Sequence, residues 1–202
     1  MPLSPLKRFM GNMILKDKEI ISEAMKSLES NKEKLRSKAF TVLLQISENN
    51  PEYLYPEWER ITEILRKEEV SNKYVAIHLI ANLVQIDNAD KFEKMFDDFY
   101  NLICHESPVV SPHIAEKSGK IIKAKPHLQR RIIEILLTTD KISQCRHKEL
   151  LKGYVISAFD ECFPFIENKE EVFKYVEKQM NSESPKTKKK AKEFLKKYKK
   201  YD

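Results

Sequence analysis

The sequence predicts an all-α protein folded as a right-handed α-α superhelix, a solenoid of about five antiparallel helix pairs. Three observations indicate this. The 202 residues contain only three glycines, where average usage would give about fourteen; this disfavours glycine-turned sheets and excludes a glycine-rich phosphate loop. No stretch alternates apolar and polar residues as a strand does. Finally, one pattern recurs about every 38 residues, and a fixed period is typical of repeat proteins.

The length suits one domain, and a hydrophobic content of 41% supplies a core. We predict an N-terminal segment at 1–15 and one repeat domain at 16–202. Its repeats are placed at about 16–50, 51–88, 89–125, 126–166 and 167–202.

The first helix of each pair is indicated by apolar residues at helical spacing. Breakers rich in Asn, Asp and Pro separate these helices from the preceding repeat. The marking residues are Ile20, Ile21, Ala24, Met25 and Leu28; Trp58, Ile61, Ile64 and Leu65; Phe92, Met95, Phe96, Phe99 and Ile103; Leu128, Ile132, Ile135 and Leu136; and Val172, Tyr175, Val176 and Met180.

The second helix of each pair carries a small residue where closely packed helix axes need one. These residues follow one another at intervals of 37, 39, 38 and 38: Ala39, Ala76, Ala115, Gly153 and Ala191. Asn31, Ser71, Ser107-Pro108 and Ser184-Pro185 are predicted to start these helices as N-caps, two of them with Pro at the first helical position. Gly119 also falls inside such a helix, which predicts close helix contact there.

A basic residue three positions before the small one completes the motif in three repeats. Leu35-Arg36-x-x-Ala39, Lys73-x-x-Ala76 and Lys188-x-x-Ala191 resemble HEAT repeats of the HEAT/armadillo type, over roughly 16–200. Pro112 and Leu150 depart from the motif in the two middle repeats. Such solenoids bind partners on a concave surface. A non-repeating helical bundle is the alternative fold.

The three cysteines are odd in number and far apart, so we expect half-buried free thiols rather than a disulfide framework. A reducing compartment fits this pattern, and the N-terminus shows no signal-peptide core, so the prediction is cytoplasmic. No apolar run is long enough to span a membrane. Cys104-His105 and Cys145-x-His147 lack the paired spacing of a zinc site. We therefore predict no metal and no cofactor.

The net charge of +6 is concentrated in two blocks. Residues 181–202 hold nine lysines against three acidic residues, and residues 117–152 hold ten Lys/Arg against Glu134, Asp140 and Glu149. His113, Lys117 and Lys120 lie at i, i+4 and i+7 on one helix face. With few acidic partners in the sequence nearby, the predicted partner-binding face comprises His113, Lys117, Lys120, Lys123, Arg130, Arg131, Arg146, Lys148 and Lys152.

The C-terminal lysines surround an apolar stripe and predict a polar cap on the terminal repeat. The same end is a possible second basic surface through Lys188, Lys189, Lys192 and Lys196.

No catalytic constellation is evident, and we interpret His78 as an ordinary half-buried or surface histidine. The leading hypothesis is a non-catalytic scaffold that binds a protein partner, such as an acidic segment, on a concave and partly basic surface. The alternative is nucleic-acid binding by the same groove. HEAT-like DNA glycosylases for alkylated bases use several tryptophans on a basic concave surface, whereas this chain has only Trp58. No residue of theirs can be matched here.

Overall fold

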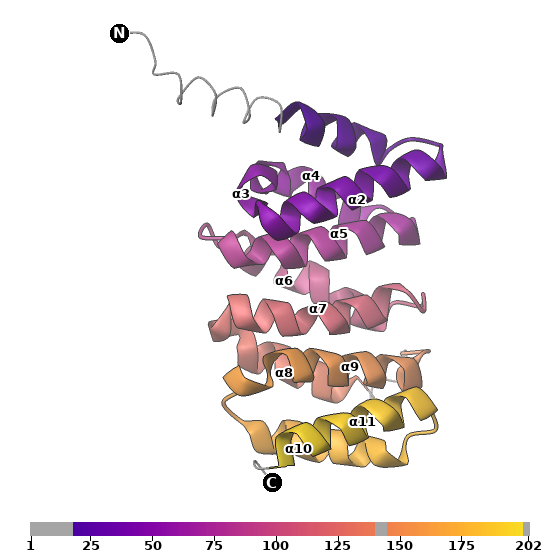
Figure 1. The fold of residues 1–202 in the computed structure, drawn as a ribbon, viewed down its shortest axis with the longest axis vertical. Coiled ribbons are helices and arrows are strands. Elements are labelled where there is room, and N and C mark those ends of the chain that lie inside the picture. The colour runs from indigo at the N-terminus through magenta and orange to yellow at the C-terminus, as the bar shows by residue number, and fades with distance from the viewer. Residues whose placement is uncertain (1–17, 140–144, 200–202) are drawn as a thin grey trace.

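The computed structural model describes residues 18–139 and 145–199. The predicted N-terminal segment lies outside these ranges. Within them the chain is helical and contains no strand. The helices form an all-α solenoid, with the helix pairs stacked along the long axis (Figure 1). The predicted fold class is confirmed.

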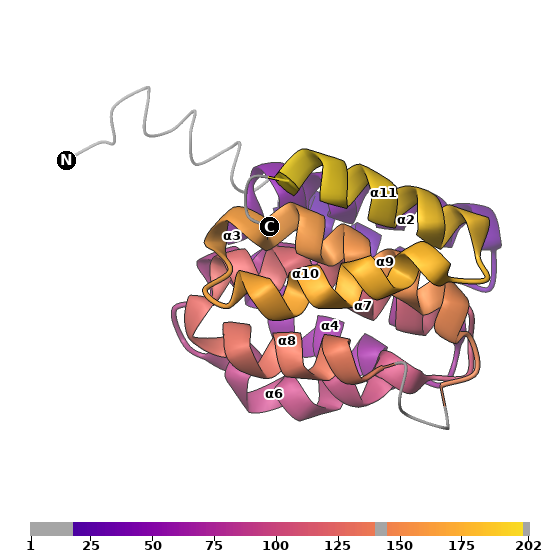
Figure 2. The same ribbon diagram turned by 90° about the horizontal axis from the view of Figure 1, so that it is seen from below.

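The helices lie in two layers. The front layer, facing the viewer in Figure 1, comprises α2 (Glu33–Asn49), α5 (Val70–Leu83), α7 (Val110–Ala124), α9 (Lys148–Cys162) and α11 (Pro185–Tyr198). The rear layer comprises residues 18–27, α4 (Trp58–Arg66), α6 (Lys91–Tyr100), α8 (Gln129–Thr138) and α10 (Lys169–Lys178). One further short helix, α3 (Pro51–Leu54), precedes α4. Viewed along the stack, α2 and α11 lie to the same side of α7, so the front layer of helices is curved (Figure 2).

Contacts between neighbouring repeats recur at the predicted period. Lys120 bonds Asn82 and Thr187 bonds the Glu149 carbonyl, and both pairs are 38 residues apart. The Tyr198 hydroxyl donates to the Asp160 carbonyl at the same separation. The period read from the sequence is therefore the stacking register.

The basic residue of the HEAT-like motif caps the preceding helix. Lys73 Nζ donates to the carbonyl oxygens of Leu65 and Lys67, at 3.2 and 2.7 Å, where α4 ends. Arg36 donates to the Ser30 carbonyl at 2.8 Å, just after helix 18–27. A cation at a helix C-terminus satisfies free carbonyls and interacts favourably with the helix dipole.

Of the predicted helix starts, only the last is right in detail. Ser184 accepts from the Thr187 N–H, and Pro185 is the first residue of α11. By contrast, α5 begins at Val70, before Ser71, and Lys32 rather than Asn31 stands at the N-cap of α2. Ser107 instead bonds the Val109 N–H in the turn before α7, which leaves Pro108 outside the helix. Turn hydrogen bonds compete with helix caps for such hydroxyls.

Close packing explains Gly119. A Cβ on this residue would lie 2.5 Å from the Ala158 carbonyl oxygen. The α7 and α9 backbones therefore meet at a position where a side chain has no room. At Gly153 a Cβ would lie 3.0 Å from Thr187 Oγ1 of α11. The predicted close contacts are both present.

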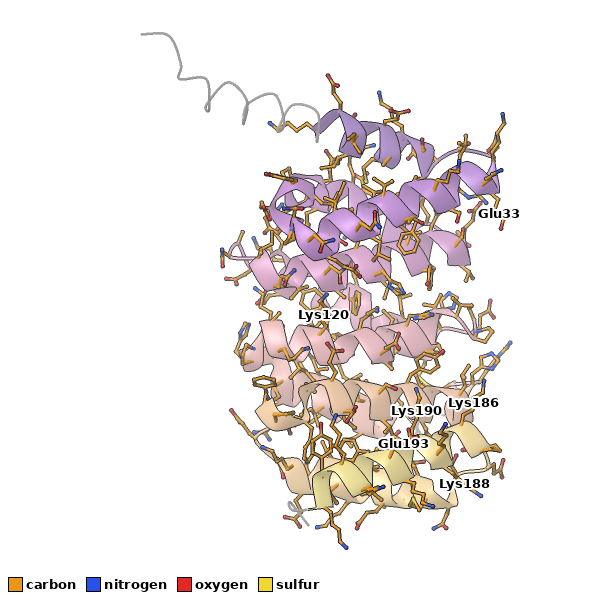
Figure 3. All side chains as sticks on the ribbon, viewed as in Figure 1. Glu33, Lys120, Lys186, Lys188, Lys190 and Glu193 are labelled. Atoms are coloured by element: carbon orange, nitrogen blue, oxygen red, sulfur yellow. A yellow bond between two sulfur atoms is a disulfide. The ribbon has the colours of Figure 1, made fainter. Side chains whose placement is uncertain are left out.

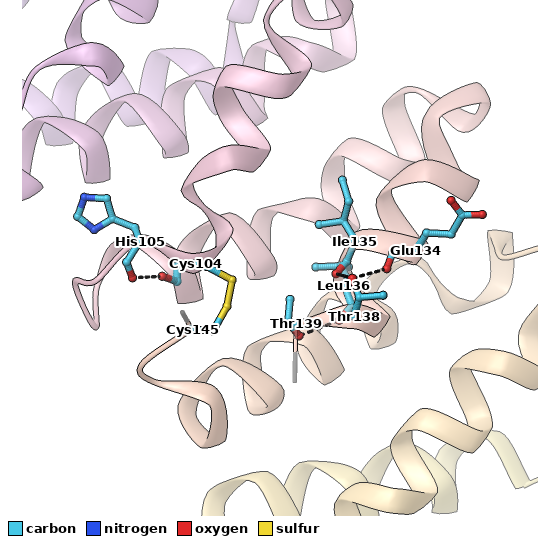
Figure 4. Close-up of a disulfide and its surroundings, with 9 residues drawn as sticks. Cys104, His105, Glu134, Ile135, Leu136, Thr138, Thr139 and Cys145 are labelled. Carbon is cyan, nitrogen blue, oxygen red and sulfur yellow. Dashed lines mark hydrogen bonds between the residues drawn. A yellow bond between two sulfur atoms is a disulfide. The ribbon is translucent and has the colours of Figure 1, made fainter. Parts of the chain in front are cut away.

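The cysteine prediction is wrong for two of three residues. Cys104 and Cys145 form a disulfide, with their Cα atoms 4.6 Å apart (Figure 4). They are 41 residues apart in the sequence, close to the repeat period of about 38, so the stacking brings their turns in neighbouring repeats together. Cys162 is a free, fully buried thiol, as expected of a small apolar residue. The His105 ring is turned away from the disulfide.

Candidate binding surface

A continuous row of rings crosses the front layer from helix to helix, and we call it the front strip. It consists of Phe40 on α2, Tyr74 and His78 on α5, His113 on α7 and Tyr154 on α9, all half-buried. Ring centroids are 5.6 Å apart for Phe40–Tyr74, 4.8 Å for Tyr74–His113 and 5.8 Å for His113–Tyr154. On α11 the row ends at Lys190, whose Nζ lies 4.9 Å from the Tyr154 ring.

The rings meet at steep angles. Phe40–Tyr74, Tyr74–His113 and His113–Tyr154 are inclined at 66°, 78° and 68°. Edge-to-face pairs of this kind contribute about 0.5–1.5 kcal/mol each beyond their buried area. The strip is therefore held in place by its own ring contacts, with one side left to solvent.

The ring centroids of His78 and His113, at the centre of the strip, are 5.1 Å apart. His78 Nε2 is buried and has no hydrogen-bond partner among the described residues. Burial, followed by the charge of Lys117, lowers the pKa of His78 to about 3, so this ring is neutral at pH 7. His113 Nδ1 lies 3.4 Å from Glu116 Oε2 but without hydrogen-bond geometry. The proximity of His113 in turn lowers the pKa of Glu116.

Two lysines beside the strip hydrogen-bond neutral groups. Lys120 Nζ donates to Asn82 Oδ1 and Lys190 Nζ donates to Ser157 Oγ, each at 2.6 Å. Neither ammonium is in an ion pair with a described residue, and both lie on the front face (Figure 3). Burial lowers the pKa of Lys120. Both lysines keep their positive charge available to a ligand.

The two layers differ in charge. The five front-layer helices hold sixteen Lys/Arg against seven Asp/Glu, with seven of the lysines on α11. The rear-layer helices hold eleven of each sign. The excess positive charge of the helices therefore lies in the front layer.

The structure divides the predicted basic face into three places. His113, Lys117 and Lys120 lie together on the front face of α7, as the i, i+4, i+7 spacing predicts. Lys123, at the end of the same helix, pairs with Glu161 of α9 at 2.6 Å.

Arg130 and Arg131 lie on the rear layer, apart from that group. Arg130 pairs with Glu134 at 3.0 Å. Arg131 pairs with Asp97 of α6 and lies 4.0 Å from the Phe96 ring centroid. Neighbouring repeats thus supply acidic partners that are not apparent from the local sequence.

Arg146, Lys148 and Lys152 lie at the start of α9, at the edge of the solenoid. Arg146 is 3.7 Å from Glu106, and Lys152 pairs with Glu149. The predicted C-terminal group is exposed on α11, where Lys189 is 3.9 Å from Glu193: Lys188, Lys189, Lys192 and Lys196.

The sequence interpretation missed most of the strip. Phe40, Tyr74, Tyr154 and Lys190 were not singled out as site residues, and His78 was treated as ordinary. A signal was present, because Phe40 and His78 are 38 residues apart and Tyr74 and His113 are 39 apart. Rings in one stacking register lie against each other in a solenoid.

Other chemistry is limited in the described part of the chain. No group of three or more His, Cys, Asp or Glu side chains there is arranged to hold a metal ion. Trp58 is 2% exposed and is part of the core, so it cannot serve as a surface aromatic. Among the described helices, none combines the length and apolar character needed to cross a membrane.

No family model matches the sequence, and no curated protein sequence matches it. Among solved structures, an engineered protein of the Northeast Structural Genomics Consortium is similar at 16% identity, covering 89% of this chain and 79% of that one, with a TM-score of 0.46. A designed armadillo repeat protein in complex with the peptide (KR)4 is 14% identical, covering 96% and 94%, also with a TM-score of 0.46.

Proposed function

We propose that this protein is a non-catalytic scaffold that binds a segment of a partner protein along the front strip. The observation that carries the proposal is the unbroken row of half-buried rings across four helices, bordered by lysines without ion-pair partners. Aromatic side chains are enriched in protein interfaces because they bury a large area and lose little conformational entropy. Ring contacts already fix these side chains before a partner arrives.

The ring geometry favours a protein partner over single-stranded nucleic acid. Bases stack on open ring faces, whereas the steep inclination between strip rings directs edges against neighbouring faces. Arg130, Arg131 and Arg146, the arginines of the predicted face, are in ion pairs. Both features reduce what the surface offers to phosphates and bases. A cytoplasmic location remains a prediction, now without support from free cysteines.

A peptide selection tests the proposal. The chain is immobilised and panned against a random 14-residue display library. In parallel, the same library is panned on a strip variant carrying Tyr74→Ala and Tyr154→Ala. The matched control carries Arg130→Ala and Arg131→Ala on the rear layer. Circular dichroism melts establish that each variant is folded.

We expect peptides that bind the parent and the rear-layer control but not the strip variant. The proposal fails if no sequence is enriched, or if enriched peptides bind the strip variant equally well. A salt titration with single-stranded DNA, duplex DNA and RNA tests the alternative, for which affinity falls steeply between about 50 and 200 mM salt. Release of a free base from alkylated DNA would contradict the non-catalytic part.

A further inference from the structure

The front strip runs into a pocket between α2 and α5. It has a volume of about 440 Å³, within the range of pockets that hold small ligands. Phe40 and Tyr74 of the strip form part of its wall. The surface exposed in the pocket is mainly apolar, although five of the other lining residues are polar and two of these, Glu33 and Arg36, are charged. The other lining residues are Leu28, Glu33, Arg36, Ser37, Val70, Ser71, Asn72, Val75 and Val109.

The rest of the strip is bordered by positive charge. Lys190 lies at the opposite end and hydrogen-bonds Ser157, whereas Lys117 and Lys120 lie on α7, in the middle; Lys120 hydrogen-bonds Asn82, and Lys117 is 3.9 Å from Glu116. The helix at that end, α11, carries seven lysines and one glutamate. A ligand that lies on the strip therefore meets an apolar cavity at one end and lysine ammonium groups at the middle and the far end.

We infer that the bound segment is an extended acidic peptide that places one large apolar side chain in the α2–α5 pocket and its carboxylates beside Lys117, Lys120 and Lys190. The inference rests on the proposed function and specifies the chemistry of its partner. A basic segment would bring like charges onto α7 and α11, which is destabilising. An apolar segment without acidic residues would leave the lysines without partners.

Helix spacing sets the register of this peptide. Neighbouring helix axes are about 8–10 Å apart, and an extended chain advances about 3.3–3.6 Å per residue. The pocket lies between α2 and α5, so α7 is about one and a half spacings away and α11 about three and a half. Carboxylates should follow the apolar anchor at about four residues for Lys117 and Lys120, and at about eight to ten residues for Lys190.

The peptides selected in the experiment above test this register directly. The expected consensus has a large apolar residue with acidic residues about four and about eight to ten positions away. The best peptide is then synthesised with a fluorophore, and its affinity is measured by anisotropy against two variants. Ser37→Trp fills the pocket, and Lys120→Glu with Lys190→Glu reverses the charge.

Each variant should bind the selected peptide with an affinity lower by about tenfold or more. Replacing the peptide's apolar anchor by Ala should remove the effect of Ser37→Trp, and replacing its acidic residues by Gln should remove the effect of the lysine reversals. The matched control, Lys174→Glu on exposed α10, should leave affinity within twofold.

The outcomes separate the two proposals. Peptides that need the strip but have a basic or register-free consensus overturn this inference and leave the scaffold proposal standing. Failure to enrich any peptide removes the scaffold proposal, and the inference with it. Binding of an oligonucleotide that displaces the selected peptide from the strip, with tighter affinity than the peptide, also overturns the inference.

Discussion

Two successive helices, α7 and α8, carry five of the ten basic residues of the block 117–152, and these residues have different environments on the two helices. On α7, Lys117 and Lys120 lie at the front strip, and Lys120 has a neutral partner. On α8, Arg130 and Arg131 lie on the rear layer and are paired with acidic groups. A block of positive charge in a solenoid sequence is therefore divided between two faces, and Lys120 on the front face has no ion-pair partner among the described residues.

Lys125 lies in the turn between these two helices and contrasts most with Lys120, because it is both buried and paired with acidic groups. Its ammonium is buried, donates to the Asp87 carbonyl at 2.7 Å and pairs with Asp87 at 3.3 Å and Glu93 at 2.9 Å. Burial alone would lower the pKa of Lys125, but its bonds to Glu93 and Asp87 raise it. This lysine binds the second and third repeats together.

Lys125→Ala should lower the free energy of unfolding by about 3–5 kcal/mol, because it leaves the buried Asp87 carboxylate without its cation. Urea denaturation measures the loss, with Lys123→Ala, at an exposed ion pair, as the control. A loss below about 1 kcal/mol would show that Lys125 is not a structural residue.

The disulfide encloses both helices, because Cys104 precedes α7 and Cys145 follows α8. Reduction should lower the free energy of unfolding by about 2–4 kcal/mol, since the reduced unfolded chain regains the freedom of a long loop. Thermal melts with and without reductant measure this difference. The variant Cys104→Ser with Cys145→Ser should melt lower and show no response to reductant, and detection of three free thiols in the native protein would contradict the bond.

Gly119 fixes α7 against α9 and so determines where the front strip lies. Gly119→Ala should cost about 1–3 kcal/mol, because the new Cβ would overlap the Ala158 carbonyl and outweigh the gain in helix propensity. Gly153→Ala is the matched comparison and should cost less, since its nearest neighbour is a side-chain hydroxyl. Equal melting temperatures for the two variants would contradict the close approach.

His78, on the front layer, makes the stability of the protein depend on pH. Its folded pKa of about 3 lies below the ordinary value of 6.5, so the unfolded state binds more protons between these values and stability falls as pH drops below about 6.5. With allowance for its partial exposure, the slope should be at most about 1 kcal/mol per pH unit between about pH 6.5 and 5. His78→Gln should flatten this part of the curve, and an unchanged slope would exclude the effect.

Substitution of Arg130 should have the smallest effect on the free energy of unfolding. Its side chain is 92% exposed in the pair with Glu134, and surface pairs of this spacing contribute about 0.3–0.5 kcal/mol. Arg130→Ala should therefore change the free energy of unfolding by no more than about 0.5 kcal/mol. A larger loss in the urea experiment would assign α8 a structural role that its exposed contact does not explain.

Much of the fold follows from periodicity. The small residue of each second helix could be predicted from the sequence, because a close contact between helices constrains residue size wherever it occurs. The helix starts were less accessible, since a serine or asparagine hydrogen-bonds a turn as readily as a helix end; Ser107 does the former and Ser184 the latter.

Part of the candidate site could likewise be predicted from local spacing, and part could not. His113, Lys117 and Lys120 share a face by helix geometry alone, so local spacing was sufficient to group them. Arg131 could not be assigned correctly, because its partner Asp97 is 34 residues away in a neighbouring repeat. The front strip crosses four helices, so no single local segment contains it. Its only signal in the sequence was the separation of its rings near the repeat period, as in Phe40–His78 and Tyr74–His113.

The sequence by itself determined the helical class, the 38-residue period and the small residues at the helix contacts, because these depend on spacing along one chain. Only the tertiary structure decided which basic residues are paired, that Cys104 and Cys145 meet, and that five rings form one strip. Those outcomes depend on distances between repeats, and the stacking register brings together side chains that no local pattern connects.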